Sequence, residues 1–134
     1  VLARVDLISM NAREAAILTG RVEPEAATAE MPARIRPGGS VVVRLGAEGC
    51  WVTGGRPPTA PVHLAGRPAK VVDTTGAGDV FLGALLAALS EGRELLPSAR
   101  FANAAASISV ERTGPSTGPV RSEVEAILTE EGEG

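Results

Sequence analysis

Apolar and polar residues alternate along the chain in segments that predict both strands and helices. Short apolar runs without helical periodicity occupy residues 5–9, 40–46 and 69–72, and we expect each to be a buried strand. The run at 40–46 continues through a Gly-Ala-Glu-Gly turn into the segment CWVTG, which is typical of a β-hairpin. A short edge strand is expected at residues 62–64.

Two helical segments are predicted between the first two strands. Asn11 and Glu14 have the spacing of a capping box, and Gly20 supplies the stop of that helix. Residues 23–36 contain helix formers, but Pro32 interrupts them, so a short or broken helix is expected there.

Three more helices are predicted in the second half of the chain. Residues 77–89 are apolar nearly all round, which indicates a buried helix. Ser98 is a candidate cap for the next helix, residues 121–129 form an amphipathic last one, and the tail at 130–134 is expected to fray. Strands alternate with helices and include one hairpin, so the chain is predicted to have a layered α/β fold with a mainly parallel sheet.

Composition narrows the class of protein. The 134 residues are enough for a single domain with a core, and their 44% hydrophobic and 22% charged content is ordinary for a globular protein. A net charge of −3 offers no basic surface for nucleic acid, and no apolar run reaches the roughly 20 residues that cross a membrane. One cysteine, Cys50, and one histidine, His63, exclude the usual metal-cluster spacings and fit a reducing, cytoplasmic compartment.

The stretch VVDTTGAGDVFLG at residues 71–83 contains the strongest candidate chemistry. It joins the end of a predicted strand to the start of a predicted helix, and open α/β sheets bind ligands at the carboxyl ends of their strands. A helix N-terminus presents free N–H groups and the positive end of the helix dipole, and glycines let an anion approach. Gly76, Ala77 and Gly78 are therefore a candidate cradle for a phosphate.

Asp79, in the first turn of that helix, has two interpretations. The helix dipole stabilises a carboxylate there by about 0.3–1 kcal/mol, so Asp79 can serve the helix alone. Alternatively it is a general base that takes a proton from an attacking hydroxyl beside the cradle, a pairing that phosphoryl transfer needs. Two other glycine motifs are excluded: the stretch has no P-loop Gly-Lys-Ser/Thr, and Phe81 replaces the third glycine of a dinucleotide fingerprint.

The segment DTTGAGDVFLGALLAAL closely resembles the C-terminal signature of the ribokinase-like (PfkB-type) carbohydrate kinases. NAREAAILTG resembles the Asn-x-x-Glu segment of that family, VVVRLGAEGCWV its strand–turn–strand over the nucleotide, and FANAAASISVERTG its penultimate helix and following loop. The four segments occur in the family's order and cover essentially the whole chain. The resemblance implies a ribokinase-like, layered α-β-α (Rossmann-like) fold and a kinase that transfers phosphate from ATP to an alcohol group of a sugar or related small molecule.

The resemblance also implies roles for individual residues. Asp79 would be the base, and the Gly76–Gly78 segment the anion hole. Asn11 and Glu14 would approach the phosphates and Mg²⁺ through water, and their role as a capping box stays open beside this one. The other implied contacts are Arg44, Gly46, Gly49, Gly78 and Asn103 for the nucleotide, and Asp73, Thr75 and the carbonyls of Ser109, Arg112 and Gly114 for a monovalent cation, usually K⁺.

Some positions depart from the family pattern or keep a second interpretation. Arg44 stands where the family often has Thr before Leu-Gly, so that hydroxyl contact is not carried over. Asp73 is equally compatible with a turn residue at a strand end. The loop TGPSTGPVR differs from the family's Gly-Ala-x-Pro-Ser form, which leaves the last cation ligand unassigned between Ser116 and Gly118.

The resemblance concerns only the C-terminal, nucleotide-binding half of the family. The other half contributes the first strands, a β-sheet lid and most sugar-binding residues, so the chain is expected to be truncated before Val1 and to transfer little or no phosphate by itself. Two alternatives stay open: a non-catalytic nucleotide-binding module or partner subunit, and a structural domain that lost its ligand. The acceptor is not specified by these residues, and the full-length protein could form a homodimer.

Overall fold

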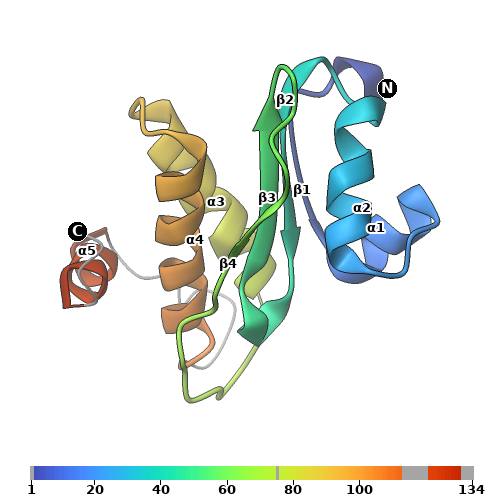
Figure 1. Ribbon diagram of the computed structural model, residues 1–134. Helices are drawn as coiled ribbons and strands as arrows, with labels where there is room; N and C mark the ends of the chain where they lie inside the picture. Colours follow the sequence, from blue (N-terminus) through green and yellow to red (C-terminus); the bar gives the residue numbers. More distant parts are fainter. Residues whose placement is uncertain (1, 75, 113–120, 131–134) are drawn as a thin grey trace. The chain divides into compact units, whose positions relative to one another are not determined.

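The computed structural model describes residues 2–74, 76–112 and 121–130 of the chain. The chain divides into two compact units, Val1–Ala65 and Gly66–Gly134, and each unit is described by itself (Figure 1).

The first unit contains a four-stranded sheet in the order β1-β2-β3-β4. β1 and β2 pair in parallel, because the chain between them crosses over through helices, whereas the short connections from β2 to β3 and from β3 to β4 give antiparallel pairs. The predicted hairpin and edge strand are confirmed, and the α/β class with them. Within the described ranges, however, the sheet is mixed and not mainly parallel. The strands are β1 Leu7–Asn11, β2 Gly38–Arg44, β3 Cys50–Gly55 and β4 Val62–Leu64.

Two helices cover one face of this sheet (Figure 1). α1 spans Ala12–Thr19 and ends at Gly20, which has the left-handed conformation expected of a stop signal. α2 spans Pro24–Glu30 and passes into a 3₁₀ turn at Met31–Arg34. Pro32 lies in that turn, so the predicted break in the helix is confirmed. Further 3₁₀ turns lie at Leu2–Arg4 and Gly46–Glu48.

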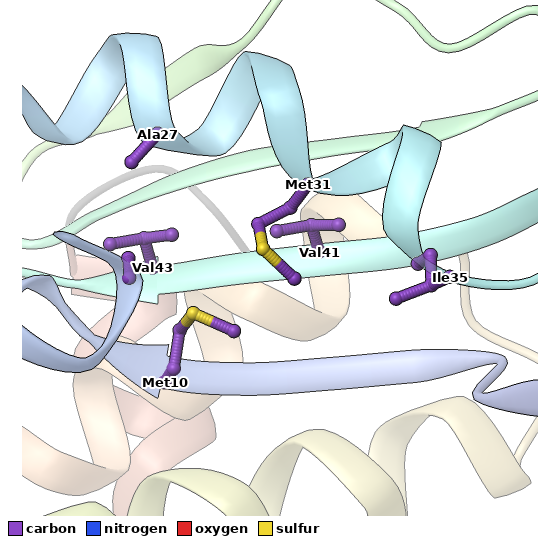
Figure 2. Close-up of a cluster of buried hydrophobic side chains, with 7 residues drawn as sticks. Met10, Ala27, Met31, Ile35, Val41 and Val43 are labelled. Carbon is purple, nitrogen blue, oxygen red and sulfur yellow. The ribbon is translucent and has the colours of Figure 1, made fainter. Parts of the chain in front are cut away.

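The core of the first unit lies between these helices and the sheet. Figure 2 shows Met31 pointing from the helical layer toward β1 and β2, with Val41 and Val43 facing it from alternate positions of β2. Gly39 lets β2 pass close to the turn before it, because a Cβ there would lie 2.7 Å from Ile35 Cδ1. The buried cluster consists of Met10, Ala15, Ala27, Met31, Ile35, Val41 and Val43.

The second unit consists of helices in its described part. α3 spans Ala77–Ser90, α4 spans Leu95–Ser109 and α5 spans Arg121–Glu130. Their shared core is formed by Ala88 of α3, by Phe101, Ala104, Ala105 and Ile108 of α4, and by Val124 and Leu128 of α5.

Three expectations for this unit are wrong. Residues 69–72 form no strand: the N–H groups of Lys70 and Val72 bond to Glu111 and Val110, just after α4, and not to a neighbouring strand. α4 begins at Leu95 and not at Ser98, since Pro97 fits the first turn of a helix. α3 is not buried all round: Leu82 and Leu86 are 38% and 48% exposed.

Candidate functional site

The first group of predicted site residues lies at the carboxyl ends of the parallel strands β1 and β2. Asn11 ends β1 and pairs in register with Arg44, which ends β2. Asn11 also caps α1: its Oδ1 accepts the Glu14 N–H at 2.8 Å, and Glu14 Oε1 accepts the Asn11 N–H at 2.9 Å. The capping box is therefore confirmed, and together with the strand register it brings Asn11, Glu14 and Arg44 together.

Arg44 and Glu14 bring opposite charges to this group. Arg44 Nη2 lies 3.9 Å from Glu14 Oε1, and the two side chains are 25% and 56% exposed. Arg44 Nε is buried and has no hydrogen-bond partner among the described residues. Within those residues Glu14 Oε2 also makes no hydrogen bond. The group thus combines a partly exposed guanidinium with a carboxylate that has an unused acceptor oxygen, which suits a phosphate with its metal ion.

The turn that follows Arg44 requires glycine at both ends. Gly46 and Gly49 have φ values of 64° and 94°, in the region that side chains disfavour. Leu45 N–H donates to the Gly49 carbonyl at 2.8 Å, which closes the turn. The turn therefore presents main chain directly after the charged group.

His63, which the sequence suggested only as an edge-strand residue, contacts the same turn. Its Nε2 lies 2.9 Å from the Glu48 carbonyl, and its ring lies 5.1 Å from that of Trp51, its register partner on β3. The predicted hairpin followed by an edge strand was the signal that could have found this contact, since it makes residues 51 and 63 neighbours across two strands.

The second group lies at the start of α3. Gly76 has φ 78° and occupies the N-cap without any side-chain hydrogen bond to the helix. The first helical bond runs from Val80 N–H to the Gly76 carbonyl at 2.9 Å. Ala77 N–H donates to the Thr74 carbonyl at 3.2 Å, so it is already engaged in a turn. Gly78 and Asp79 occupy first-turn positions, whose N–H groups have no partner within a helix.

Asp79 is exposed, and its carboxylate makes no hydrogen bond or ion pair within the described part of the chain. Its acceptor capacity is thus available to a ligand. Asn103, the other predicted residue of this unit, is half-buried in the middle of α4.

Three residues predicted to bind a monovalent cation, Asp73, Ser109 and Arg112, lie on neighbouring segments of the second unit. The N–H groups of Val72 and Asp73 both donate to the Val110 carbonyl, at 2.6 and 3.0 Å. Asp73 therefore lies against the turn after α4, in which Arg112 N–H donates to the Ser109 carbonyl at 3.1 Å. The remaining candidates, Thr75, Gly114, Ser116 and Gly118, lie outside the described residues.

Two negative observations apply to residues 2–74, 76–112 and 121–130. They contain no group of three or more His, Cys, Asp or Glu side chains that could hold a metal ion by themselves. None of their helices is both long and apolar enough to span a membrane.

Comparisons with known proteins agree on one family. The model of the pfkB family carbohydrate kinases matches residues 1–122. The chain is 37% identical over 123 residues to the ribokinase of Bacillus subtilis, covering 91% of this chain and 39% of that protein.

Two solved structures extend this similarity to the fold. A putative ribokinase II from Escherichia coli, in complex with ATP and Mg²⁺, superposes with a TM-score of 0.81 at 27% identity, covering 93% of this chain and 39% of that one. The E. coli phosphofructokinase-2, in complex with potassium, gives 0.81 at 25% identity, covering 96% and 41%. The chain thus spans well under half the length of these proteins. It belongs to the pfkB family of carbohydrate kinases.

Proposed function

We propose that this chain carries the nucleotide-binding and phosphoryl-transfer site of an ATP-dependent kinase acting on an alcohol group of a sugar or related small molecule. The observation that carries the proposal is the start of α3, where a left-handed Gly76 without a side-chain cap precedes an unpaired Asp79 in the described structure. In a chain of this family, an open helix N-terminus beside an available carboxylate suits the transfer of a phosphoryl group.

The helix start would act as an anion hole. Donors that are fixed before the reaction stabilise the charge that develops on the transferred phosphoryl group. The N–H groups from Gly76, the N-cap, to Gly78 are the proposed donors, and the α3 dipole adds to their effect. Ala77 N–H would have to exchange its 3.2 Å bond to Thr74 for the ligand, so we expect Gly78 to contribute more.

Asp79 would be the general base. Its carboxylate would accept the proton of the acceptor hydroxyl as the oxygen attacks the γ-phosphate. Because no other described side chain binds that carboxylate, both of its oxygens are available to orient the hydroxyl.

Residues of the first unit would hold the nucleotide. The Arg44 guanidinium, on a side chain that is 25% exposed, would contact a phosphate oxygen, and the Gly46–Gly49 turn would offer main chain to the nucleotide. Asn11 and Glu14 would contact the phosphates and Mg²⁺ through water, and Asn103 the adenine region. Mg²⁺ commonly binds proteins through one or two carboxylates together with substrate phosphates, so a single Glu14 with a free oxygen fits it. When bound, this ion neutralises phosphate charge.

A monovalent cation such as K⁺ is proposed beside the anion hole. Asp73 and the carbonyls of Ser109 and Arg112 are oxygen donors on segments that contact each other through Val110. We include Thr75 and Gly114 from the family resemblance. The potassium complex of E. coli phosphofructokinase-2 supports a cation of this kind in a related protein.

The proposal extends to the whole protein. It would act as a kinase on an acceptor of this class, could form a homodimer and would be located in the cytoplasm. A second candidate is a nucleotide-binding part without transfer activity of its own. We include this candidate because the chain covers only 39% of the Bacillus subtilis ribokinase. Phosphoryl transfer also requires residues that position the acceptor.

Replacing the proposed base tests the function. In the protein as its gene encodes it, Asp79→Asn should lower kcat by about 10²- to 10⁴-fold with sugar acceptors, the usual contribution of a general base. The dissociation constant of ATP, measured by calorimetry, should stay near that of the unsubstituted protein. Asp6→Asn is the matched control, because it neutralises another exposed carboxylate that pairs only with Arg36 at 3.3 Å in the described structure.

Two outcomes would contradict the proposal at different points. Near-normal turnover of Asp79→Asn would rule out the base. ATP binding without transfer to any alcohol in an acceptor screen would favour the nucleotide-binding candidate.

A further inference from the structure

The segment that leads to the proposed catalytic loop is held by α4 and not by a sheet. Residues 66–71 have no regular structure, although Val71 and Val72 suggested a strand. Both Val72 and Asp73 donate their N–H groups to the Val110 carbonyl. The main chain just after α4 is therefore one anchor for this segment.

Glu111 supplies a second anchor. Its Oε2 accepts the Lys70 N–H at 3.1 Å, and its Oε1 lies 3.9 Å from Arg67 Nη1. Arg67 Nη1 also lies 3.5 Å from Ser107 Oγ, one turn earlier on α4. Glu111 thus connects two points of the incoming segment to the end of the helix.

The position of Glu111 is unfavourable for the helix itself. α4 ends at Ser109, and a carboxylate at the C-terminal end of a helix is repelled by the helix dipole. The contacts to Lys70 N–H and to the Arg67 guanidinium offset that repulsion. This acidic residue therefore stabilises the incoming segment and not its own helix.

We infer that Glu111 is a positioning residue for the monovalent-cation site, which it serves by fixing the path of residues 67–70 and so the place of Asp73. The inference rests on the proposed function in one respect, the assignment of Asp73 as a cation ligand. Lys70 and Asp73 are three residues apart, so the two anchors restrain both ends of a short connection. Without Glu111, the connection loses its anchor at Lys70, and its path before Val72 is less restrained.

Amide hydrogen exchange tests the positioning in the 134-residue chain without any ligand. Glu111→Ala should speed exchange at Lys70 by about fivefold or more, the factor that corresponds to losing one typical hydrogen bond, with a smaller increase at Val72 and Asp73. Glu111→Gln keeps an acceptor oxygen and should restore most of the protection. Unchanged exchange at these three amides in Glu111→Ala would overturn the inference.

Potassium dependence tests the link to the site. In the protein as its gene encodes it, Glu111→Ala should raise the K⁺ concentration for half-maximal activity by about three- to tenfold, and Glu111→Gln should raise it less. Glu125→Ala is the matched control, since it removes a 2.9 Å ion pair with Arg93 elsewhere in the same unit. Glu125→Ala should leave the K⁺ dependence unchanged.

The two measurements separate the inference from the function on which it rests. If the unsubstituted protein transfers phosphate without responding to K⁺, the proposed cation site fails, and hydrogen exchange alone decides whether Glu111 fixes the segment. Faster exchange together with an unshifted K⁺ dependence would overturn the positioning role at the site.

Discussion

The helices α1 and α3 start in opposite ways. α1 is closed by side chains, since Asn11 and Glu14 satisfy each other's main-chain N–H groups. α3 starts at a left-handed Gly76 that offers no side chain to its first turn. The two starts lie in different units, and the chain uses different residue types for them.

The difference separates two ways of presenting charge. At α1 the main-chain donors are occupied, so side chains, including the Glu14 carboxylate and the nearby Arg44, are left to meet a ligand. At α3 the main chain itself is available, and one carboxylate stands beside it. A helix start with charged side chains, as at α1, suits contact with a metal ion and a phosphate. A helix start with open main-chain N–H groups, as at α3, suits negative charge that develops during a reaction.

The largest effect is expected from closing the open start. Gly76→Ala places a side chain at φ 78°, which costs about 1–2 kcal/mol of folding free energy, and it should also lower kcat by disturbing the donors of the first turn. Gly92→Ala is the matched control, because Gly92 has φ 84° at the other end of α3 and open space around it. Denaturant unfolding should give similar losses for both, and kinetics should separate them. Equal kcat values would show that the open start is only structural.

The next effect concerns the closed start. Asn11→Ala removes the acceptor for Glu14 N–H and should lower the free energy of unfolding by about 1 kcal/mol. Asn11→Asp retains an acceptor and should come within a few tenths of a kcal/mol of the unsubstituted chain. Denaturant unfolding measures both, and a stable Asn11→Ala would mean that the capping box contributes nothing.

A smaller change in stability, with a clear change in binding, is expected from Glu14→Gln. The amide oxygen can still accept the Asn11 N–H, so only the charge and the 3.9 Å pair with Arg44 are lost, worth about 0–1 kcal/mol for a partly exposed pair. Calorimetry should show weaker binding of ATP in the presence of Mg²⁺. If ATP binding to Glu14→Gln depends on Mg²⁺ as it does in the unsubstituted chain, Glu14 serves only as a helix cap.

The smallest effect is expected at the C-terminal end of α3, opposite to its own start. Hydrogen bonding to Arg121 lowers the pKa of Glu91 below its usual value, and the nearby charges of Arg121 and Arg93 act in the same direction. The stabilisation is therefore present above the unfolded pKa of about 4.3 and is lost as pH falls through the lower folded pKa. The Tm difference between the chain and Glu91→Gln should be small at pH 7 and vanish in acid. A Tm difference that does not shrink anywhere in an acid titration would contradict the pairing.

Local patterns predicted the elements well where the signal lies in neighbouring residues. Asn11, Glu14 and Gly20 fixed both ends of α1 because caps depend on residues within one turn. The strand predicted at residues 69–72 is absent. β-branched residues favour a strand, but a strand forms only where a neighbouring strand pairs with it. The β1 and β2 boundaries each moved by two residues for the same reason, since pairing sets the register.

In the candidate site, too, local sequence signals predicted some features and long-range contacts determined the others. The start of α3 could be predicted from the glycines near Asp79, since Gly76 is its N-cap and Gly78 lies in its first turn. The proximity of Arg44 to Glu14 could not, since it depends on the parallel register of β1 and β2. Glu111 was missed because its partners, Lys70 and Arg67, are about forty residues earlier in the chain.

The double contact of the Val110 carbonyl has a consequence for how this protein tolerates mutation. Because main-chain atoms alone make the bonds to Val72 and Asp73, no change of side chain at residue 110 deletes them. Alanine scanning would pass over this anchor entirely, and only a proline at residue 72 or 73, which lacks the donor, would reveal it. The path of residues 70–73 toward the proposed catalytic residues can therefore persist when mutations remove its side-chain contacts one by one.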